Sequence, residues 1–344
     1  MHDVPPSPSG SSGQPDRRRA VRLLLGAGTA AAGVGAFGFG ERLAAAQGLS
    51  DRTVTFNVPF TPGSGPDSLA RILAEELRQR WKQPVIIENK AGASGNIGTQ
   101  ATAKATPDGH TILITTNPFV MNTSLFKSLP YDPQTSFVPL VEIATGTLAL
   151  AVHPSLGVSN VAELLAAAKA RPGAIDYASP GRGTPQHLAM ELFKLTAAVD
   201  MKHIPFTGSA GAVQALTGGH VPAMIVPVHT ALPLVESGNI RLLAVTSARR
   251  SELAPTVPTF TELGLSVDVD LWYAALAPAG TPPAIQQRYV EAFNEILSRP
   301  SVRATLAKQG LVPVGGPAQT LADRLSRDRP RWARVIEEAR ITAD

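Results

Sequence analysis

Two short loops rich in glycine and proline hold the residues with the clearest potential for chemistry. One spans residues 59–67 and the other spans residues 179–185. Each loop follows a short apolar run and precedes a helix-like segment. Pro66 and Pro185 suit the first position of a helix, and Thr184 is a natural helix cap. Because a helix start leaves backbone N–H groups unpaired at its positive end, we predict that both loops face a cleft and hold a small anion.

Motifs of common enzyme classes are not supported by the sequence. There is no G-x-x-x-x-G-K-[ST] phosphate loop and no G-x-S-x-G hydrolase pattern, and Gly181-Arg182-Gly183 does not continue into a dinucleotide-binding motif. His187 lies beside the second loop and is the candidate base if the protein is an enzyme that acts on organic acids; otherwise its role is structural. We predict a protein with no catalytic residue, no metal and no cofactor, and keep the enzyme as an alternative.

Composition narrows the class of protein further. The chain has no cysteine, which excludes disulfides, thiolate catalysis and cysteine zinc sites. Its formal charge of +4 is small for 344 residues, and basic residues neither cluster nor interleave with aromatic ones. Nucleic acid is therefore not an expected partner.

The first 46 residues have the composition of an export signal. Arginines at positions 17–19 and 22 precede a weakly apolar run over residues 23–40, and three alanines stand at 44–46. A positive region, an apolar region and small residues at a cleavage site form the secretory pattern, and the paired arginines favour the twin-arginine route. We expect residues 1–46 to be removed and the mature protein to be periplasmic; an N-terminal membrane anchor is the alternative.

The rest of the chain alternates between strand-like and helix-like segments, which predicts an α/β protein with mainly parallel sheets covered by helices. The expected strands are residues 53–58, 84–88, 110–115, 137–141, 147–153, 174–178, 201–204, 222–226, 241–246 and 271–277. The expected helices are residues 66–81, 96–105, 185–196, 209–216, 283–297, 302–309 and 317–339, with another that begins near 158. We predict two lobes, with residues 47–150 and 247–344 in domain 1, residues 151–246 in domain 2, and hinge strands between them.

Several segments together resemble one known family. Residues 58–71, 88–98, 107–111, 129–133, 152–156, 177–184, 203–210, 243–247 and 277–282 are similar to motifs of the periplasmic receptors of tripartite tricarboxylate transporters, the Bug family. The similar segments cover the mature chain in the family's order. The resemblance implies a hinged, two-lobed fold of the type II periplasmic-binding-protein kind, without catalytic activity.

The resemblance also implies a ligand, a partner and a set of contacts. The ligand would be a small carboxylate (a di- or tricarboxylate, an aromatic acid or similar) bound between the lobes by a monomeric receptor. The partner would be the integral-membrane permease subunits of such a transporter. The residues implied in binding are Phe60, Ser64, Gly65, Asp67, Ser179, Gly181, Gly183, Thr184, Phe206, Thr207 and Val226.

Some positions depart from the family pattern. Val226 stands where many members carry an acidic residue, and Thr207 stands where lysine is frequent. A cationic or amino-acid ligand is therefore not the expectation. A sensor that presents its liganded form to a membrane signalling protein would have a similar sequence, and it stays open as an alternative to the transport receptor.

Overall fold

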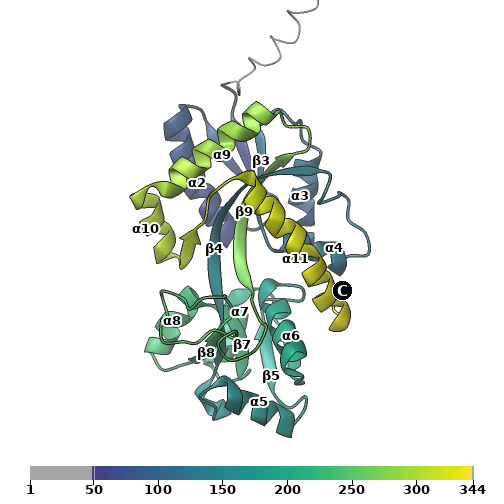
Figure 1. Cartoon of the computed structure of the whole chain (residues 1–344), viewed down its shortest axis with the longest axis vertical. Coiled ribbons are helices and arrows are strands. Elements are labelled where there is room, and N and C mark those ends of the chain that lie inside the picture. The colour runs from purple at the N-terminus through teal and green to yellow at the C-terminus, as the bar shows by residue number, and fades with distance from the viewer. Residues whose placement is uncertain (1–48, 50, 343–344) are drawn as a thin grey trace, which may run out of the picture. The chain divides into compact units, whose positions relative to one another are not determined.

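The computed structural model describes Leu49 and residues 51–342, and the predicted export signal at residues 1–46 lies outside them. Within the described range ten strands form one mixed sheet in the order β2-β1-β3-β9-β4-β7-β5-β6, and β8 and β10 also pair with β4. Helices pack around the sheet (Figure 1). The α/β prediction is confirmed. The strands are β1 (Val54–Val58), β2 (Val85–Asn89), β3 (Thr111–Thr116), β4 (Phe137–Val152), β5 (Asp176–Ser179), β6 (Lys202–Pro205), β7 (Ala223–Pro227), β8 (Arg241–Val245), β9 (Asp270–Pro278) and β10 (Leu311–Pro313).

Parallel pairing occurs in two separate parts of the sheet. Strand β1 lies between β2 and β3, and β5 lies between β6 and β7, in every case with parallel pairing. β1 ends at Val58, directly before the first loop, and β5 ends at Ser179, where the second loop begins. Both loops therefore leave the carboxyl end of a parallel strand that has neighbours on both sides, the position at which α/β sheets bind ligands.

Two long strands connect these parts and make the sheet mixed. β4 pairs antiparallel with β9 and β10 over its first part and with β7 and β8 over its last part. β4 is one strand of 16 residues, whereas the sequence indicated two separate strands. The sequence suggested a break because Glu142 and the Thr145-Gly146-Thr147 run interrupt the apolar pattern. The backbone nevertheless stays extended there.

The observed helices match the predicted ones well wherever one face of the helix is apolar. They are α2 (Gly65–Trp81), α3 (Asn96–Ala103), α4 (Pro118–Leu125), α5 (Val161–Ala170), α6 (Pro185–Ala197), α7 (Ser209–Thr217), α8 (Val228–Glu236), α9 (Pro283–Ser298), α10 (Pro300–Lys308) and α11 (Ala318–Glu338), with short 3-10 turns η1 (Ala93–Gly95) and η2 (Pro154–Leu156). In α2, Leu69, Leu73 and Leu77 are buried at four-residue spacing, as the periodic pattern predicts. No described helix is long and apolar enough to cross a bilayer.

Two helices and one strand were not predicted. In α4 the residues from Pro118 to Asn122 are all buried, so the helix has no polar face and no amphipathic period to recognise. Helix α8 contains Pro233, which normally argues against a helix, and β10 has only three residues. Tertiary packing rather than local pattern stabilises these elements.

A cluster of charged side chains ties β4 and β9 to α11. Arg324 of α11 donates to Glu142 of β4 (Nε to Oε2, 2.9 Å) and to Asp270 of β9 (Nη1 to Oδ1, 2.9 Å). Asp328 accepts a hydrogen bond from the Trp272 indole at 3.1 Å. Burial raises the pKa of Glu142, and the Arg324 charge opposes that effect. The charge of the buried Glu142 carboxylate thus depends on Arg324.

We predict that replacing Arg324 with methionine lowers the free energy of unfolding by about 3 kcal/mol, because the substitution leaves Glu142 buried without its cation. The matched control is Arg327→Met, whose side chain is 62% exposed and contacts Asp328 at 3.3 Å. Its loss should cost less than about 1 kcal/mol. Urea unfolding of both variants measures the difference; equal effects would contradict the role given to Arg324.

Candidate ligand-binding site

The first loop ends at a helix whose start is not capped by a side chain. Ser64 occupies the N-cap position of α2 in extended conformation, but its hydroxyl makes no capping hydrogen bond. The Ser64 Oγ is buried and has no hydrogen-bond partner within the described part of the chain. Gly65 follows as the first helical residue. The loop therefore presents a buried hydroxyl that the fold itself leaves unused.

Asp67 fixes the shape of this loop. Its Oδ2 accepts hydrogen bonds from the Gly63 N–H at 2.8 Å and from Arg71 Nε at 2.9 Å, and its Oδ1 accepts from Asn89 Nδ2 and Arg71 Nη2, each at 3.0 Å. Burial alone would raise the pKa of Asp67, but these hydrogen bonds outweigh it and lower the pKa. The carboxylate is thus ionised, with both oxygens occupied by protein donors. A role in positioning the loop fits this geometry better than direct ligand contact.

A third loop, residues 92–95, has unusual backbone geometry and lies against Phe60 of the first loop. Residues 92–95 all have positive φ angles: 131° at Gly92, 47° at Ala93, 54° at Ser94 and 93° at Gly95. A side chain at Gly95 would meet the Phe60 ring at 3.3 Å. Non-glycine residues in this region cost on the order of 1 kcal/mol each, and such strain gathers at functional sites. The sequence indicated only an ordinary loop here. The glycines that flank Ala93 and Ser94 were the feature that could have indicated positive φ angles.

The loop after β5 is held by its own polar groups. The Ser179 hydroxyl donates to the Gly181 carbonyl at 3.0 Å and lies 2.6 Å from His203 Nε2. The Thr184 hydroxyl donates to the same carbonyl at 2.8 Å and caps α6 by accepting from the His187 N–H, which confirms the predicted cap. The Gly183 N–H donates to His187 Nδ1 at 3.0 Å. Most of the polar groups predicted to hold a ligand here therefore maintain the loop.

Three aromatic rings stack beneath the second loop. The His187 and His203 rings lie 3.8 Å apart at an interplanar angle of 13°, and Tyr177 stacks on His203 at 4.9 Å. Burial lowers the pKa of His187 to about 3 and that of His203 to about 4, with a further contribution from the Arg182 charge. Both imidazoles are therefore neutral at pH 7, and the His187 Nδ1 is free of a proton and accepts from the loop. This arrangement gives His187 a structural role.

The other predicted residues differ widely in exposure. Phe206 is half-buried, and its N–H donates to the Ser179 carbonyl at 2.9 Å, so it is tied to the second loop. Thr207 is exposed. Val226 is fully buried, pairs with Ala149 of β4 and belongs to an apolar cluster. Val226 therefore contributes to the core of this part of the sheet.

The second loop contacts helix α4, which in turn contacts the loop packed against Phe60. A side chain at Gly183 (φ 70°) would meet Leu125 of α4 at 2.7 Å. Asn122 of the same helix donates to the Ser94 carbonyl at 3.0 Å, and that strained loop lies against Phe60. Helix α4 thus contacts the second loop directly and is connected to the first loop through residues 92–95. Opposition of the loops across a cleft stays a prediction.

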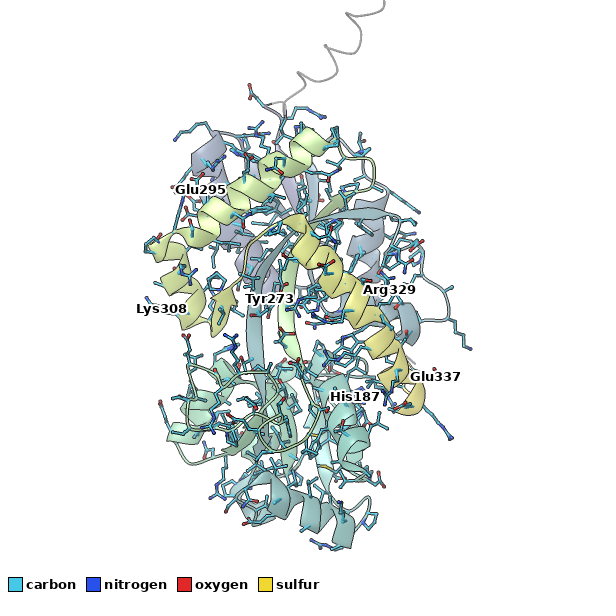
Figure 2. All side chains as sticks on the ribbon, viewed as in Figure 1. His187, Tyr273, Glu295, Lys308, Arg329 and Glu337 are labelled. Carbon is cyan, nitrogen blue, oxygen red and sulfur yellow. The ribbon has the colours of Figure 1, made fainter. Side chains whose placement is uncertain are left out.

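Tyr273 of β9 packs against the first loop, although it lies far from that loop in the sequence. A side chain at Gly65 would come within 2.6 Å of the Tyr273 hydroxyl, so only glycine leaves room for this ring. Tyr273 is 7% exposed, and burial raises its pKa to about 12. Figure 2 labels Tyr273 on β9 and His187 on α6. The sequence did not indicate Tyr273, because it reads as one more apolar residue in a buried strand.

We predict that the histidine stack makes stability depend on pH. Because the pKa of His187 is about 3 when folded, below its ordinary value of 6.5, the unfolded chain binds more protons between these values. The free energy of unfolding should therefore fall as pH drops from 7 to 5. In His187→Asn this fall should be smaller, since the amide does not titrate but can accept from the Gly183 N–H. His187→Leu should lose about 1–3 kcal/mol at pH 7 because that donor loses its acceptor.

Urea unfolding at pH 7 and pH 5 measures both effects. An asparagine variant with the same pH dependence as the wild type would contradict the assignment. Equal stability of the leucine and asparagine variants at pH 7 would contradict the hydrogen-bonding role.

Sequence and structure comparisons agree on the relatives of the chain. The sequence profile of the tripartite tricarboxylate transporter family receptor matches residues 69–341. Protein BugT of Bordetella pertussis is 39% identical over 294 residues, which are 83% of this chain and 89% of BugT. Rpa4515 of R. palustris, solved with adipate, has a TM-score of 0.75 at 35% identity and covers 85% of this chain and 98% of its own.

A third similar protein is MatC (Rpa3494) from Rhodopseudomonas palustris, solved with bound malate. Its TM-score is 0.72 at 28% identity, over 83% of this chain and 99% of MatC. The family profile spans most of the chain, and the resemblance inferred from its motifs is confirmed. The chain belongs to the tripartite tricarboxylate transporter receptor family of periplasmic solute-binding proteins.

Proposed function

We propose that the protein is a periplasmic receptor that binds a small carboxylate for a tripartite tricarboxylate-type transporter. The observation that carries this proposal is the family match together with two loops that each join a parallel strand to a helix start. The ligand lies between a lobe formed by residues 47–150 and 247–344 and a lobe formed by residues 151–246. Permease subunits in the membrane receive it from a monomeric receptor without chemical conversion.

The charges near the loops suit a dicarboxylate or an aromatic acid. Arg71 is occupied by Asp67, so the first loop offers neutral donors to the ligand. Arg182 in the second loop is exposed and supplies a positive charge that attracts anions. The similar proteins solved with adipate and malate support a dicarboxylate. Neither Val226 nor Thr207 supplies a carboxylate for an ammonium group, which argues against an amino acid.

Ligand binding should raise the thermal stability of protein stripped of retained solute. The probes are adipate, malate, citrate, benzoate and, as a contrast, glutamate. At a probe concentration 100 times Kd the gain is about 2.7 kcal/mol, which corresponds to a few degrees in Tm for a chain of this size. Mass spectrometry of solute released from natively purified protein extends the panel. Failure of every acid to shift Tm would contradict the receptor function, and conversion of a bound acid would favour the enzyme.

Two glycines provide a matched test of the site. Gly183 and Gly264 have φ angles of 70° and 75°, so alanine strains the backbone equally at both. At Gly183 the new Cβ also meets Leu125, whereas at Gly264 nothing lies within 4 Å. Gly183→Ala should therefore weaken binding of any acid that wild type binds, and Gly264→Ala should not. Equal affinities would argue against the second loop as part of the site.

We also propose that the twin-arginine route exports the protein with its first 46 residues as the signal. Replacing Arg17 and Arg18 by lysine should leave uncleaved precursor in the cytoplasm, because that pathway reads the paired arginines. The control is Arg42→Lys, beyond the apolar run. Cell fractionation and the mass of the N-terminal peptide measure the outcome. Unchanged export of the double variant would contradict this route.

A further inference from the structure

Two hydroxyls, one in the first loop and one on β9 beside it, have no acceptor among the described residues. Ser64 Oγ is buried without a partner among residues 51–342. The Tyr273 hydroxyl lies over Gly65, the residue that follows Ser64, and makes no hydrogen bond with the described residues. An unsatisfied buried hydroxyl is costly, and native proteins pair such groups with protein, water or ligand. Ser64 Oγ is such a group, and together with the Tyr273 hydroxyl over Gly65 it indicates a group that the chain itself does not supply.

The fold holds Tyr273 firmly in this place. β9 lies between β3 and β4, where Tyr273 pairs with Thr116 on one side and Ala144 on the other. Gly65 leaves the room that the phenol ring occupies. The hydroxyl is therefore presented by a central strand and not by a mobile loop, which is the arrangement expected of a residue that selects among ligands.

Neighbouring polar groups cannot serve as the missing acceptor. Both oxygens of Asp67 already accept from Gly63, Arg71 and Asn89. The second loop differs from the first, because the hydroxyls of Ser179 and Thr184 both donate to the Gly181 carbonyl. The hydroxyls of Ser64 and Tyr273, by contrast, stay available to a ligand. A phenol and an aliphatic hydroxyl are both neutral, and each can donate one hydrogen bond to a carboxylate.

We propose that Tyr273 Oη and Ser64 Oγ together donate to one carboxylate of the ligand, so that Tyr273 is a specificity-determining residue of the receptor. This assignment rests on the proposed function. Its chemistry requires an acceptor at this corner: a ligand that places a carboxylate there gains two hydrogen bonds. A ligand that places an ammonium or a methyl group there leaves both hydroxyls unpaired. Tyr273 then selects the acid end of the solute.

The test compares two Tyr→Phe substitutions that each remove a buried phenol hydroxyl. Tyr289 of α9 donates to the Gly109 carbonyl at 2.6 Å and is the matched control. Tyr273→Phe should weaken the binding of adipate and malate about ten- to a hundred-fold, the value of a hydrogen bond to a charged group. It should leave the unfolding midpoint of the stripped protein unchanged, because its hydroxyl has no protein partner.

Tyr289→Phe should show the opposite pattern, with a lower unfolding midpoint and an unchanged Kd. Isothermal titration of both acids and urea unfolding without ligand give the two readouts. Ser64→Ala should weaken binding in the same direction as Tyr273→Phe, and the double variant should lose more than either single one.

The possible outcomes separate the two proposals. If wild type binds either acid and Tyr273→Phe binds it equally well, the role of Tyr273 is overturned while the receptor function stands. A lower unfolding midpoint of Tyr273→Phe with unchanged Kd would likewise overturn it, because the hydroxyl would then serve the fold through water. If wild type binds neither acid and releases no acid on denaturation, the receptor function falls and this assignment falls with it.

Discussion

The antiparallel pairing of β4 with β9 is the constraint on which the rest of the structure depends. Each strand passes from one parallel part of the sheet towards the other, and together they carry the backbone hydrogen bonds between these parts (Figure 1). Any movement of one part against the other must bend these strands. The Arg324 cluster attaches both of them to α11, so charged contacts as well as the sheet hold these strands in place.

The two predicted loops contribute to the site in different ways. In the second loop the hydroxyls of Ser179 and Thr184, the Gly183 N–H and two neutral histidines are used to hold one backbone shape. In the first loop Asp67 and Asn89 hold the backbone, and Ser64 Oγ has no partner among the described residues. A rigid second loop and a first loop with free hydroxyls would together provide shape on one side and hydrogen-bond donors on the other.

Much of this arrangement could be predicted from the sequence. The apolar spacing in α2, the Thr184 cap and the order of strands and helices are local signals, and the loops at the ends of β1 and β5 follow from them. The role of Tyr273 could not be predicted, because it depends on a ring packed over Gly65 from more than 200 residues further along the chain. The same reason applies to α4 and to Val226, whose positions are decided by burial on all sides.

The use of neutral donors also bears on what a transport receptor must do. A carboxylate held by a buried arginine gains a strong charge-assisted pair, but it leaves an uncompensated buried cation when it departs. Hydroxyls and helix-terminal N–H groups cost much less to leave empty, since water can replace the ligand as their acceptor. Arg71 is kept paired with Asp67, which removes the nearest arginine of the first loop from the ligand's reach. In the proposed receptor, such a loop would bind an acid selectively and still release it to a membrane partner.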